Sequence, residues 1–289
     1  MRRLTPYALL TPAVLALLVF VVLPLVLVTV LSFFDLNLIT NQLKFVGFTN
    51  YATELGDDAF WTAVRNTILY GLYTVVPSLG IGLGIALLIS GLDRGQAFWR
   101  SVYFLPVACT LVAMSSVWRW MFQPDIGIVD QVFGPILGVT DWLNNPQLAL
   151  VAIAVVGNWH QIGLVAILYL AALGSIPTDP YDSARLDGAG AVNRFWHVTW
   201  PALGPTTVFA VVVTCSAALQ AYDTIVAMTG GGPAGATETL TYAIWTRGIR
   251  YFDLGRAAVL SVFLLGLSLV ITGAQRSRTG RTLETAGTR

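Results

Sequence analysis

The chain has 289 residues, of which 56% are hydrophobic and 11% are charged, and its formal net charge at pH 7 is +1. A soluble domain usually carries about 25% charged residues, whereas the mean hydropathy of this chain is +0.72. Such a composition excludes a single soluble core and indicates a protein that is solvated by lipid. The near-zero charge gives no indication of a nucleic-acid partner.

Apolar segments long enough to cross a membrane recur along the chain. A helix needs about 20 consecutive apolar residues to span the hydrocarbon layer. The segments that meet this length lie at residues 7–34, 66–90, 101–121, 148–173, 206–228 and 255–275. The first follows Arg2 and Arg3, as a signal peptide would, but its apolar run is longer than that of a signal peptide, and we expect it to be retained. The sequence predicts an all-α integral membrane protein with six spans in a single domain, residues 1–289.

Basic residues in the connecting segments predict the orientation, because Lys and Arg are enriched on the cytoplasmic side of a membrane. With the N-terminus inside, ten basic residues lie on the cytoplasmic side and six lie outside. The connection at residues 125–147 carries no Lys or Arg, which agrees with an external position. We therefore expect both termini in the cytoplasm.

The connection between the fourth and fifth spans, residues 176–205, is the most informative segment. It reads IPTDPYDSARLDGAGAVNRFWHVTWPALGP. Pro177 and Pro180 precede a stretch at residues 181–186 that predicts a short helix with acidic residues near its positively polarised end, and Gly188 follows. A short helix with small exposed side chains suits docking into a groove of a partner protein.

This segment resembles the EAA loop of binding-protein-dependent ABC importers. The pattern of that family is Glu-Ala-Ala, three residues, Gly, nine residues and Ile-x-Leu-Pro, and the spacing here fits throughout. Asp182, Ser183, Val198 and Trp200 stand where the pattern has Glu, Ala, Ile and Leu. The resemblance implies that the helix couples the membrane spans to a cytoplasmic ATPase. The residues to which it assigns this coupling are Tyr181, Asp182, Ser183, Ala184, Asp187, Gly188, Ala189 and Pro201.

Shorter fragments extend the resemblance over nearly the whole chain. They are FVGFTNY at residues 45–51, FWTAVRNT at residues 60–67, FLP at residues 104–106 and GGGP at residues 230–233. In this order they resemble the first permease subunits of maltose-type and glycerol-phosphate-type importers. The resemblance implies a multi-pass protein of the bacterial inner (cytoplasmic) membrane that forms the pathway for a sugar or sugar-like solute. The implied partners are a second homologous permease subunit, a cytoplasmic ATPase dimer and an extracytoplasmic solute-binding protein.

The sequence contains no motif for nucleotide binding. A Walker A loop needs a lysine after its glycines to reach the phosphates, and Lys44, the only lysine, is followed by Phe45. We therefore expect no enzymatic activity and no cofactor in this chain, and we assign ATP and magnesium to the partner ATPase. Cys109 and Cys215 lie in apolar segments, which favours small hydrophobic residues over a disulfide or a metal pair.

Polar residues inside two spans are candidates for the solute path, because such residues are costly in a membrane. Residues three apart share a helix face, and each span offers one such polar pair beside an aromatic ring. Amides, a carboxylate and aromatic rings suit the hydroxyls and ring faces of a sugar. The alternative is that these residues only hydrogen-bond neighbouring helices. The candidates are Asn158, Trp159 and Gln161 in the fourth span and Gln220, Tyr222 and Asp223 in the fifth.

Two other classes of function stay open on these grounds. An ion-coupled secondary transporter of a small polar solute should show inverted repeats and coupling carboxylates at mid-membrane, whereas Asp223, near one end of its span, is the only acidic residue within a predicted span. A membrane enzyme should show a nucleophile with its base or a metal motif, and the sequence contains neither. A permease subunit is the preferred interpretation.

Overall fold

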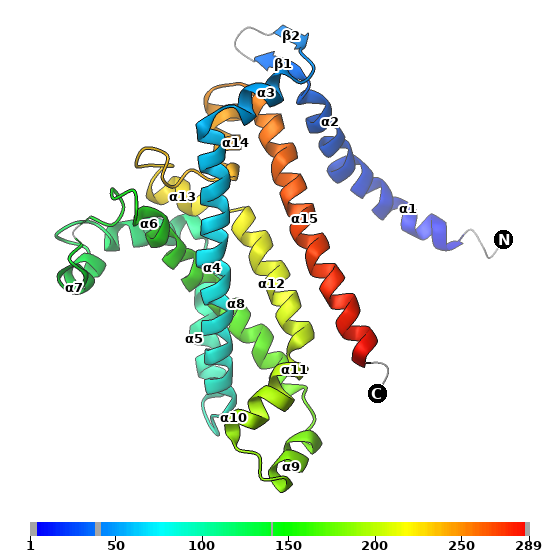
Figure 1. Cartoon of the computed structure of the whole chain (residues 1–289), viewed down its shortest axis with the longest axis vertical. Helices are drawn as coiled ribbons and strands as arrows, with labels where there is room; N and C mark the ends of the chain where they lie inside the picture. Colours follow the sequence, from blue (N-terminus) through cyan, green and yellow to red (C-terminus); the bar gives the residue numbers. More distant parts are fainter. Residues whose placement is uncertain (1–4, 38–41, 140, 287–289) are drawn as a thin grey trace. The chain divides into compact units, whose positions relative to one another are not determined.

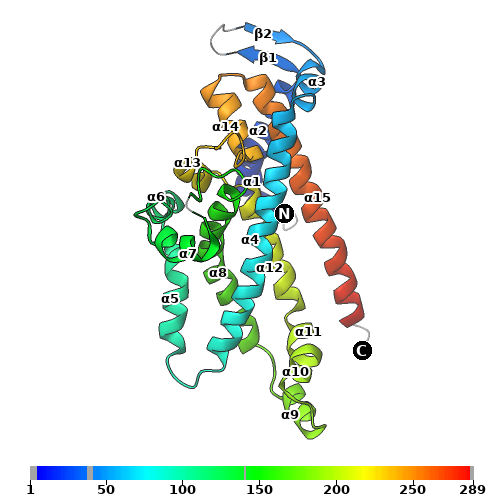
Figure 2. The same cartoon turned by 60° about the vertical axis from the view of Figure 1, so that its left-hand side comes forward.

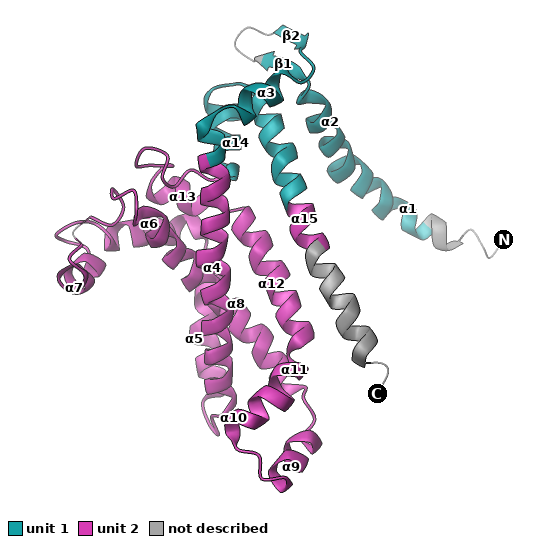
Figure 3. Cartoon of the chain, viewed as in Figure 1, with its two compact units in different colours: residues 1–61, 240–267 teal, residues 62–239, 268–289 magenta. Residues whose placement is uncertain are grey.

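A computed structural model describes residues 5–37, 42–139 and 141–286, which are mostly helical (Figure 1). They form two compact units, one from residues 1–61 and 240–267 and the other from residues 62–239 and 268–289 (Figure 3). Two helices, α4 (Asp58–Ser90) and α15 (Leu254–Ala286), contribute to both units. The predicted fold class, an all-α membrane protein, is confirmed with one small β-hairpin added. The single domain over residues 1–289 stays a prediction.

The first unit begins with a long apolar helix in three segments, α1 (Thr5–Leu17), the π-helical turn η1 (Leu18–Val22) and α2 (Leu23–Leu31). The π-helical turn ends just before Pro24, whose ring lacks an N–H and crowds the preceding turn. No residue in the most apolar stretch of Leu9–Leu31 is buried. Such an all-round apolar helix is stable only against lipid or another apolar protein surface.

A hairpin follows, in which β1 (Phe34–Asn37) runs antiparallel to β2 (Gln42–Phe45). The Nδ2 of Asn50 donates to the carbonyl of Ser32 at 3.0 Å and to that of Phe34 at 2.9 Å. These bonds satisfy carbonyls at the end of α2 and hold the hairpin to the helix that follows it. The other elements of this unit are α3 (Thr49–Leu55), α14 (Leu240–Trp245), the π-helical turn η3 (Thr246–Arg250) and the first part of α15.

The second unit is built around α8 (Ala149–Gly174), which packs against α5, α12 and α13. In both views α9 lies at one end of this unit, beyond the turn between α4 and α5, and α13 lies toward the other end (Figures 1 and 2). Besides α8 and most of α4, the unit contains α5 (Gln96–Ala108), α6 (Leu111–Met121), α7 (Ile128–Leu137), α9 (Asp179–Leu186), α10 (Ala191–Arg194), the π-helical turn η2 (Phe195–Thr199), α11 (Trp200–Ala202), α12 (Gly204–Leu219) and α13 (Asp223–Met228).

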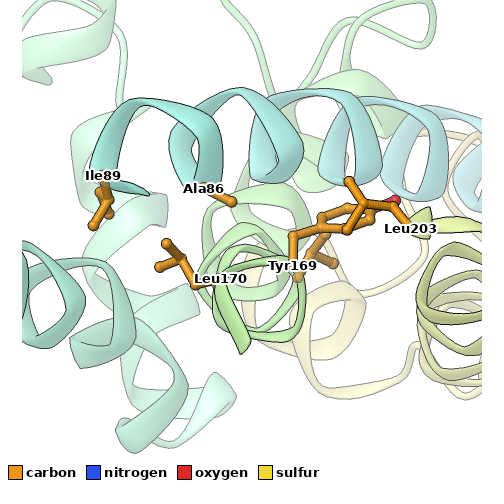
Figure 4. Close-up of a cluster of buried hydrophobic side chains, with 6 residues drawn as sticks. Ala86, Ile89, Tyr169, Leu170 and Leu203 are labelled. Atoms are coloured by element: carbon orange, nitrogen blue, oxygen red, sulfur yellow. The ribbon is translucent and has the colours of Figure 1, made fainter. Parts of the chain in front are cut away.

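A cluster of buried apolar side chains joins α4 to α8 (Figure 4). Ala86 and Ile89 come from α4, and Tyr169 and Leu170 come from α8. Leu203, at the junction of α11 and α12, completes this part of the cluster and is wholly buried. Because lipid is as apolar as these side chains, close packing rather than exclusion of water holds such helices together. The cluster therefore fixes the start of α12 against α4 and α8.

Predicted and observed spans agree where one helix carries the whole apolar run. The predictions at 7–34, 66–90, 148–173 and 255–275 correspond to Leu9–Leu31, Asp58–Ser90, Ala149–Gly174 and Leu254–Gly273. In the described chain, two bent helix pairs bring the number of spans to six if each pair crosses once. The helix α4 begins about two turns earlier than predicted, because Asp58 in its first turn is stabilised by the helix dipole.

The predicted continuous span at residues 101–121 differs from the structure. The helix α5 ends at Ala108, α6 begins at Leu111, and the two axes differ by 96°. Pro106 removes an N–H from the helix, and Cys109 then adopts an extended backbone with φ −94° and ψ 147°. The proline lies in the first third of the apolar run, and the helix ends two residues after it instead of continuing through the run.

The predicted span at residues 206–228 is also interrupted. The helix α12 ends at Leu219 and α13 begins at Asp223. Within the break, Thr239 Oγ1 donates to the carbonyl of Ala221 at 3.2 Å. A side chain from another segment thus supplies the partner that the broken helix lacks. The break contains no Pro or Gly, so the sequence carries no local signal for it.

Candidate functional site

The predicted coupling helix is present as α9, which begins at Asp179 rather than at Tyr181. Pro180 occupies its first turn, where a missing N–H costs nothing. Asp179 and Asp182 place negative charge at the positive end of the helix dipole. The exposed pair of Asp182 with Arg185, 3.2 Å apart, adds little stability. Local signals in the sequence are thus sufficient to start α9.

The end of α9 is a Schellman motif centred on Gly188. The N–H of Gly188 donates to the carbonyl of Arg185 at 3.0 Å, and the N–H of Ala189 donates to the carbonyl of Ala184 at 2.9 Å. This motif needs a left-handed residue, and Gly188 has φ +75°. A Cβ at Gly188 would meet nothing within 4 Å. The backbone conformation, and not the space around it, therefore requires glycine here.

Large apolar side chains are exposed around α9. Leu186 at its end is 90% exposed, Val192 is 70% exposed and Trp196 is 56% exposed. Exposed apolar side chains that gather on one surface indicate a protein interaction site. Five of the eight predicted coupling residues are also exposed, while Tyr181, Ala184 and Ala189 are half-buried. The five exposed residues are Asp182, Ser183, Asp187, Gly188 and Pro201.

A hydrogen bond connects α9 to the segment that leads into α12. The hydroxyl of Tyr181 lies 2.8 Å from Oγ1 of Thr199, a buried residue at the end of η2. The helical run Ala191–Ala202 that contains Thr199 then meets α12 at a bend of 64°. Leu203 at this bend is inserted into the cluster of Figure 4. A chain of contacts therefore runs from α9 through Thr199 and Leu203 to the start of α12.

Asn158, a solute-path candidate on α8, is engaged by α4. Its Nδ2 donates to the carbonyl of Tyr73 at 2.7 Å, and its Oδ1 accepts from the hydroxyl of Ser78 at 2.8 Å. Both ends of the amide thus hold α8 against α4. These bonds favour the packing alternative for Asn158 over direct contact with solute.

Gln161 differs from Asn158 although both lie on α8. It is 7% exposed, and its Oε1 is buried with no hydrogen-bond partner among the described residues. A buried unsatisfied carbonyl costs about 1–3 kcal/mol, so a polar group that reaches Gln161 would be held there. The neighbouring Trp159 packs against Trp118 of α6, with ring centroids 5.8 Å apart. Gln161 is therefore the candidate on α8 that has an unused hydrogen-bond acceptor.

The three candidates of the fifth span all lie at the break between α12 and α13. Gln220 caps α12, and its Nε2 donates to the hydroxyl of Ser216 at 3.2 Å. Tyr222 precedes α13, and Asp223 is its exposed first residue. Both α12 and α13 pack against α8. The break places an amide, a phenol and a carboxylate within four residues, and Gln220 and Asp223 do not share one continuous helix face as predicted.

The first unit contains a charged cluster that the sequence did not predict. Glu54 is 1% exposed and forms ion pairs with Arg247, at 3.5 Å, and with Arg256. Asp57 Oδ2 lies 2.9 Å from a guanidinium nitrogen of each arginine. The N–H of Ala59 and the guanidinium of Arg256 lower the pKa of Asp57 below its ordinary value of 3.8. Only the proximity of α3 to η3 and α15, invisible in the sequence, brings these residues together.

Comparison with known proteins places the chain in a family. Its residues 78–278 match the model of the binding-protein-dependent transport system inner membrane component. The chain is 35% identical over 273 residues to the sulfoquinovosyl glycerol transport system permease protein SmoG of Agrobacterium fabrum, covering 93% of this chain and 88% of the relative. It is 31% identical over 233 residues to the sn-glycerol-3-phosphate transport system permease protein UgpA of the same organism, covering 80% of each.

Solved structures share the fold at lower identity. A chain of a bacterial ABC transporter that imports the acidic polysaccharide alginate aligns with a TM-score of 0.83 and 21% identity, covering 97% of this chain and 96% of that one. The same type of transporter in complex with an alginate pentasaccharide-bound periplasmic protein aligns with a TM-score of 0.81. The family consists of multi-pass transport permeases and not of enzymes. From the family match and the 35% identity, the chain belongs to the binding-protein-dependent transport system inner membrane components.

Proposed function

We propose that this chain and a second homologous permease subunit form the membrane pathway of an ATP-driven importer for a sugar or a sugar-like solute. The relatives are named for sulfoquinovosyl glycerol, glycerol-3-phosphate and arabinooligosaccharides, which all carry two or more hydroxyl groups. An extracytoplasmic binding protein delivers the solute, and a cytoplasmic ATPase dimer binds ATP and magnesium. Family membership favours this function over an ion-coupled secondary transporter. Both termini lie in the cytoplasm in this proposal.

The structure of α9 is the observation that supports this proposal most strongly. The helix has a fixed beginning at Pro180 and a fixed end at Gly188, and it presents Leu186 almost wholly to solvent. A short, rigid helix with one projecting apolar side chain fits a groove on a partner. We assign this groove to the ATPase, and the eight coupling residues predicted from the sequence surround the contact.

In this mechanism the ATPase moves α9, and α9 moves the membrane helices. Closure of the ATPase dimer displaces the seated helix, and the Tyr181–Thr199 hydrogen bond carries the displacement to η2. Leu203 passes it to the cluster of α4 and α8, because a close-packed core transmits strain. The start of α12 then moves together with the ends of α4 and α8 that are packed against it, and the solute path opens outward to receive solute.

The solute path in this proposal passes α8 and the break between α12 and α13. Gln161 supplies an unsatisfied carbonyl, and Trp159 supplies a ring face. Gln220, Tyr222 and Asp223 add polar groups at the break. Asn158 acts as a positioning residue, since its amide is occupied by α4. Sugar hydroxyls both donate and accept hydrogen bonds and therefore match this mixture of groups.

The test is a substitution of the projecting side chain. The change Leu186→Asp buries an unpaired carboxylate in the docked state, and we expect the ATPase to be lost from the purified complex and uptake to fall at least about tenfold. The matched control is Leu43→Asp on the exposed β2 strand, which should retain both. Normal recovery of the ATPase with Leu186→Asp would show that α9 does not dock there.

A further inference from the structure

A polar cavity with a volume of about 450 Å³ lies at the C-terminal end of α6 in the second unit. Sites for small organic ligands typically measure about 300–1,000 Å³, so the cavity can hold one. Its walls come from α6, from the segments before and after α7 and from the last residue of α13. None of its residues belongs to the coupling residues or to the solute-path candidates. The polar side chains in the walls are those of Ser116, Arg119, Gln123, Asp141 and Asn144.

Arg119 lies in this cavity with most of its hydrogen-bond donors unused. Its Nη1 donates to the carbonyl of Ala227 near the end of α13, over a long distance of 3.4 Å, whereas a guanidinium carries five N–H donors. Among the described residues, no ion pair includes Arg119, although Asp141 lines the same cavity. The cavity therefore contains two opposite charges that a ligand hydroxyl, which both donates and accepts, can bridge.

Asp141 and Asn144 are held in place before a ligand arrives. The N–H of Asn144 donates to Oδ1 of Asp141 at 3.1 Å, and its Nδ2 contacts Oδ1 at 3.2 Å and Oδ2 at 3.0 Å. A carboxylate offers about four lone-pair sites, so these bonds do not use all of its capacity as an acceptor. Side chains that are already ordered lose less entropy on binding. The pair therefore provides a preorganised acceptor.

Trp120 adds an apolar ring to the cavity wall. It is 58% exposed, whereas Trp118, two residues earlier, packs on Phe122 and Trp159. The C–H face of a sugar ring gains free energy when it covers an exposed indole, because apolar surface is removed from water. The alternative role of an exposed Trp near a span end is that of an anchor at the membrane interface.

The mixture of groups favours an uncharged sugar ring over an anion. A phosphate or carboxylate group accepts from Arg119, but the carboxylate of Asp141 in the same cavity repels it. Sugar hydroxyls accept from Arg119 and Gln123 and donate to Asp141. The apolar face of the same ring covers Trp120. An uncharged sugar thus provides each of these side chains with a matching group.

We propose that this cavity is a further binding site for one uncharged sugar ring. The helix α13 packs against α6, and Ala227, which accepts from Arg119, follows Asp223 by one turn, about 6 Å along the helix axis. The site therefore lies close to the break between α12 and α13. The inference rests on the function proposed above, in which the connection at residues 125–147 is external. The cavity then receives a sugar ring at the outer end of the solute path.

Protection of an introduced cysteine tests this site without a transport assay. Leu143, which lines the cavity, is replaced by Cys after Cys109 and Cys215, the only cysteines of the chain, are changed to Ala. The complex with its second permease subunit and ATPase is placed in nanodiscs, and labelling by methanethiosulfonate ethylsulfonate is followed from the intact mass of this chain. The neutral probes are D-glucose, D-galactose, L-arabinose and maltose, and the anionic probes are D-glucuronate and glucose-6-phosphate. The matched control is Gln147→Cys, which is exposed and does not line the cavity.

We expect at least one neutral sugar to slow labelling of Leu143→Cys but not of Gln147→Cys. In the Leu143→Cys background, Arg119→Gln should raise the apparent Kd for protection at least about tenfold, the loss expected for one charge-assisted hydrogen bond. Trp120→Ala should raise it by a similar factor, and Trp120→Phe, which keeps a ring, should restore most of the affinity. Trp99→Ala, at a partly exposed Trp outside the cavity, should leave it unchanged at equal recovery of complex.

Three outcomes would overturn the proposal. They are protection by none of the neutral sugars, protection by the anionic probes alone, and protection that is unchanged in either Arg119→Gln or Trp120→Ala. An unchanged Trp120→Ala would assign this side chain to membrane anchoring. Protection by a sugar that the complex does not import with ATP would contradict only the proposed function, and import of one of the four neutral sugars without protection would contradict only the further site.

Discussion

The hydroxyl of Tyr181 lies 2.8 Å from Oγ1 of Thr199 and joins α9 to the helix that leads into α12. Thr199 is buried, whereas most of the surface around α9 is exposed. The hydrogen bond therefore connects the exposed segment around α9 to a buried residue of the second unit. Because Leu203 follows four residues later and is wholly buried, the connection continues into the core.

Removing this hydrogen bond should uncouple ATP hydrolysis from uptake. We expect Tyr181→Phe and Thr199→Val each to weaken the attachment of α9 by about 0.5–1.5 kcal/mol and to lower the solute transported per ATP hydrolysed. The double variant should cost no more than the larger single one, because both changes remove the same bond. Additive losses in a double-mutant cycle would show that the two hydroxyls act independently.

Gly188 and Gly190 provide a matched pair around the end of α9. Gly188 has a left-handed backbone, Gly190 has φ −68°, and neither would meet a neighbouring atom within 4 Å if it carried a Cβ. Gly188→Ala should therefore cost about 1–2 kcal/mol in backbone strain alone and reduce uptake, whereas Gly190→Ala should be tolerated. Gly188→Asn should lie between them, since Asn accepts this conformation better. Equal uptake in all three variants would refute the requirement.

Alanine substitutions at Asn158 and Gln161 should affect assembly of the complex and transport differently. Asn158→Ala breaks two bonds to α4, so we expect less assembled complex but near-normal uptake per complex. Gln161→Ala removes an unsatisfied carbonyl, so assembly should be unchanged or slightly improved while uptake per complex falls. The measurement is initial uptake divided by the amount of complex recovered. The reverse pattern would exchange the two roles.

In the first unit, we expect substitutions in the charged cluster to lower the free energy of unfolding more than substitutions at exposed positions. Glu54→Gln leaves two arginines without their buried partner, and we expect a loss of about 1–3 kcal/mol in the free energy of unfolding. Asp57→Asn should cost less, because Asp57 is partly exposed. Asp93→Asn in an exposed turn is the control and should change nothing. Thermal unfolding of the detergent-solubilised wild-type chain and the three variants measures the order of their stability losses.

Acid should weaken the same cluster. The pKa of Asp57 is lower in the folded chain than its ordinary value of 3.8, because Ala59 N–H and the arginines stabilise the carboxylate. A lowered folded-state pKa adds stability above the unfolded-state pKa, and this contribution is lost as the pH falls through the folded-state value. The difference in Tm between the wild-type chain and Asp57→Asn should therefore be constant from neutral pH to about pH 5 and shrink below about pH 4. A constant difference at all pH values would exclude this origin.

Local signals in the sequence were sufficient to predict those elements whose structure depends on residues close together in the chain. The apolar runs at 148–173 and 255–275 predicted α8 and the spanning part of α15, because about 20 apolar residues leave few alternatives to a membrane helix. The prolines and glycines of the 176–205 connection predicted a short helix at α9, since they fix the backbone directly. The spacing of this connection also identified the family, which comparison with known proteins confirmed.

The features that the sequence did not predict depend on contacts between residues that are far apart in the chain. The break after Leu219 rests on a bond from Thr239, and the cluster around Glu54 needs two arginines about 200 residues away. Two hydrogen bonds with α4 distinguish Asn158 from Gln161, although both are polar amides on one helix. Periodicity and composition indicate which face of a helix is polar. Which residue that face contacts depends on how the helices pack. The sequence by itself therefore determined the class, the four spans that are single helices and the short helix α9. The tertiary structure decided where the other two predicted spans break and which polar groups are hydrogen-bonded.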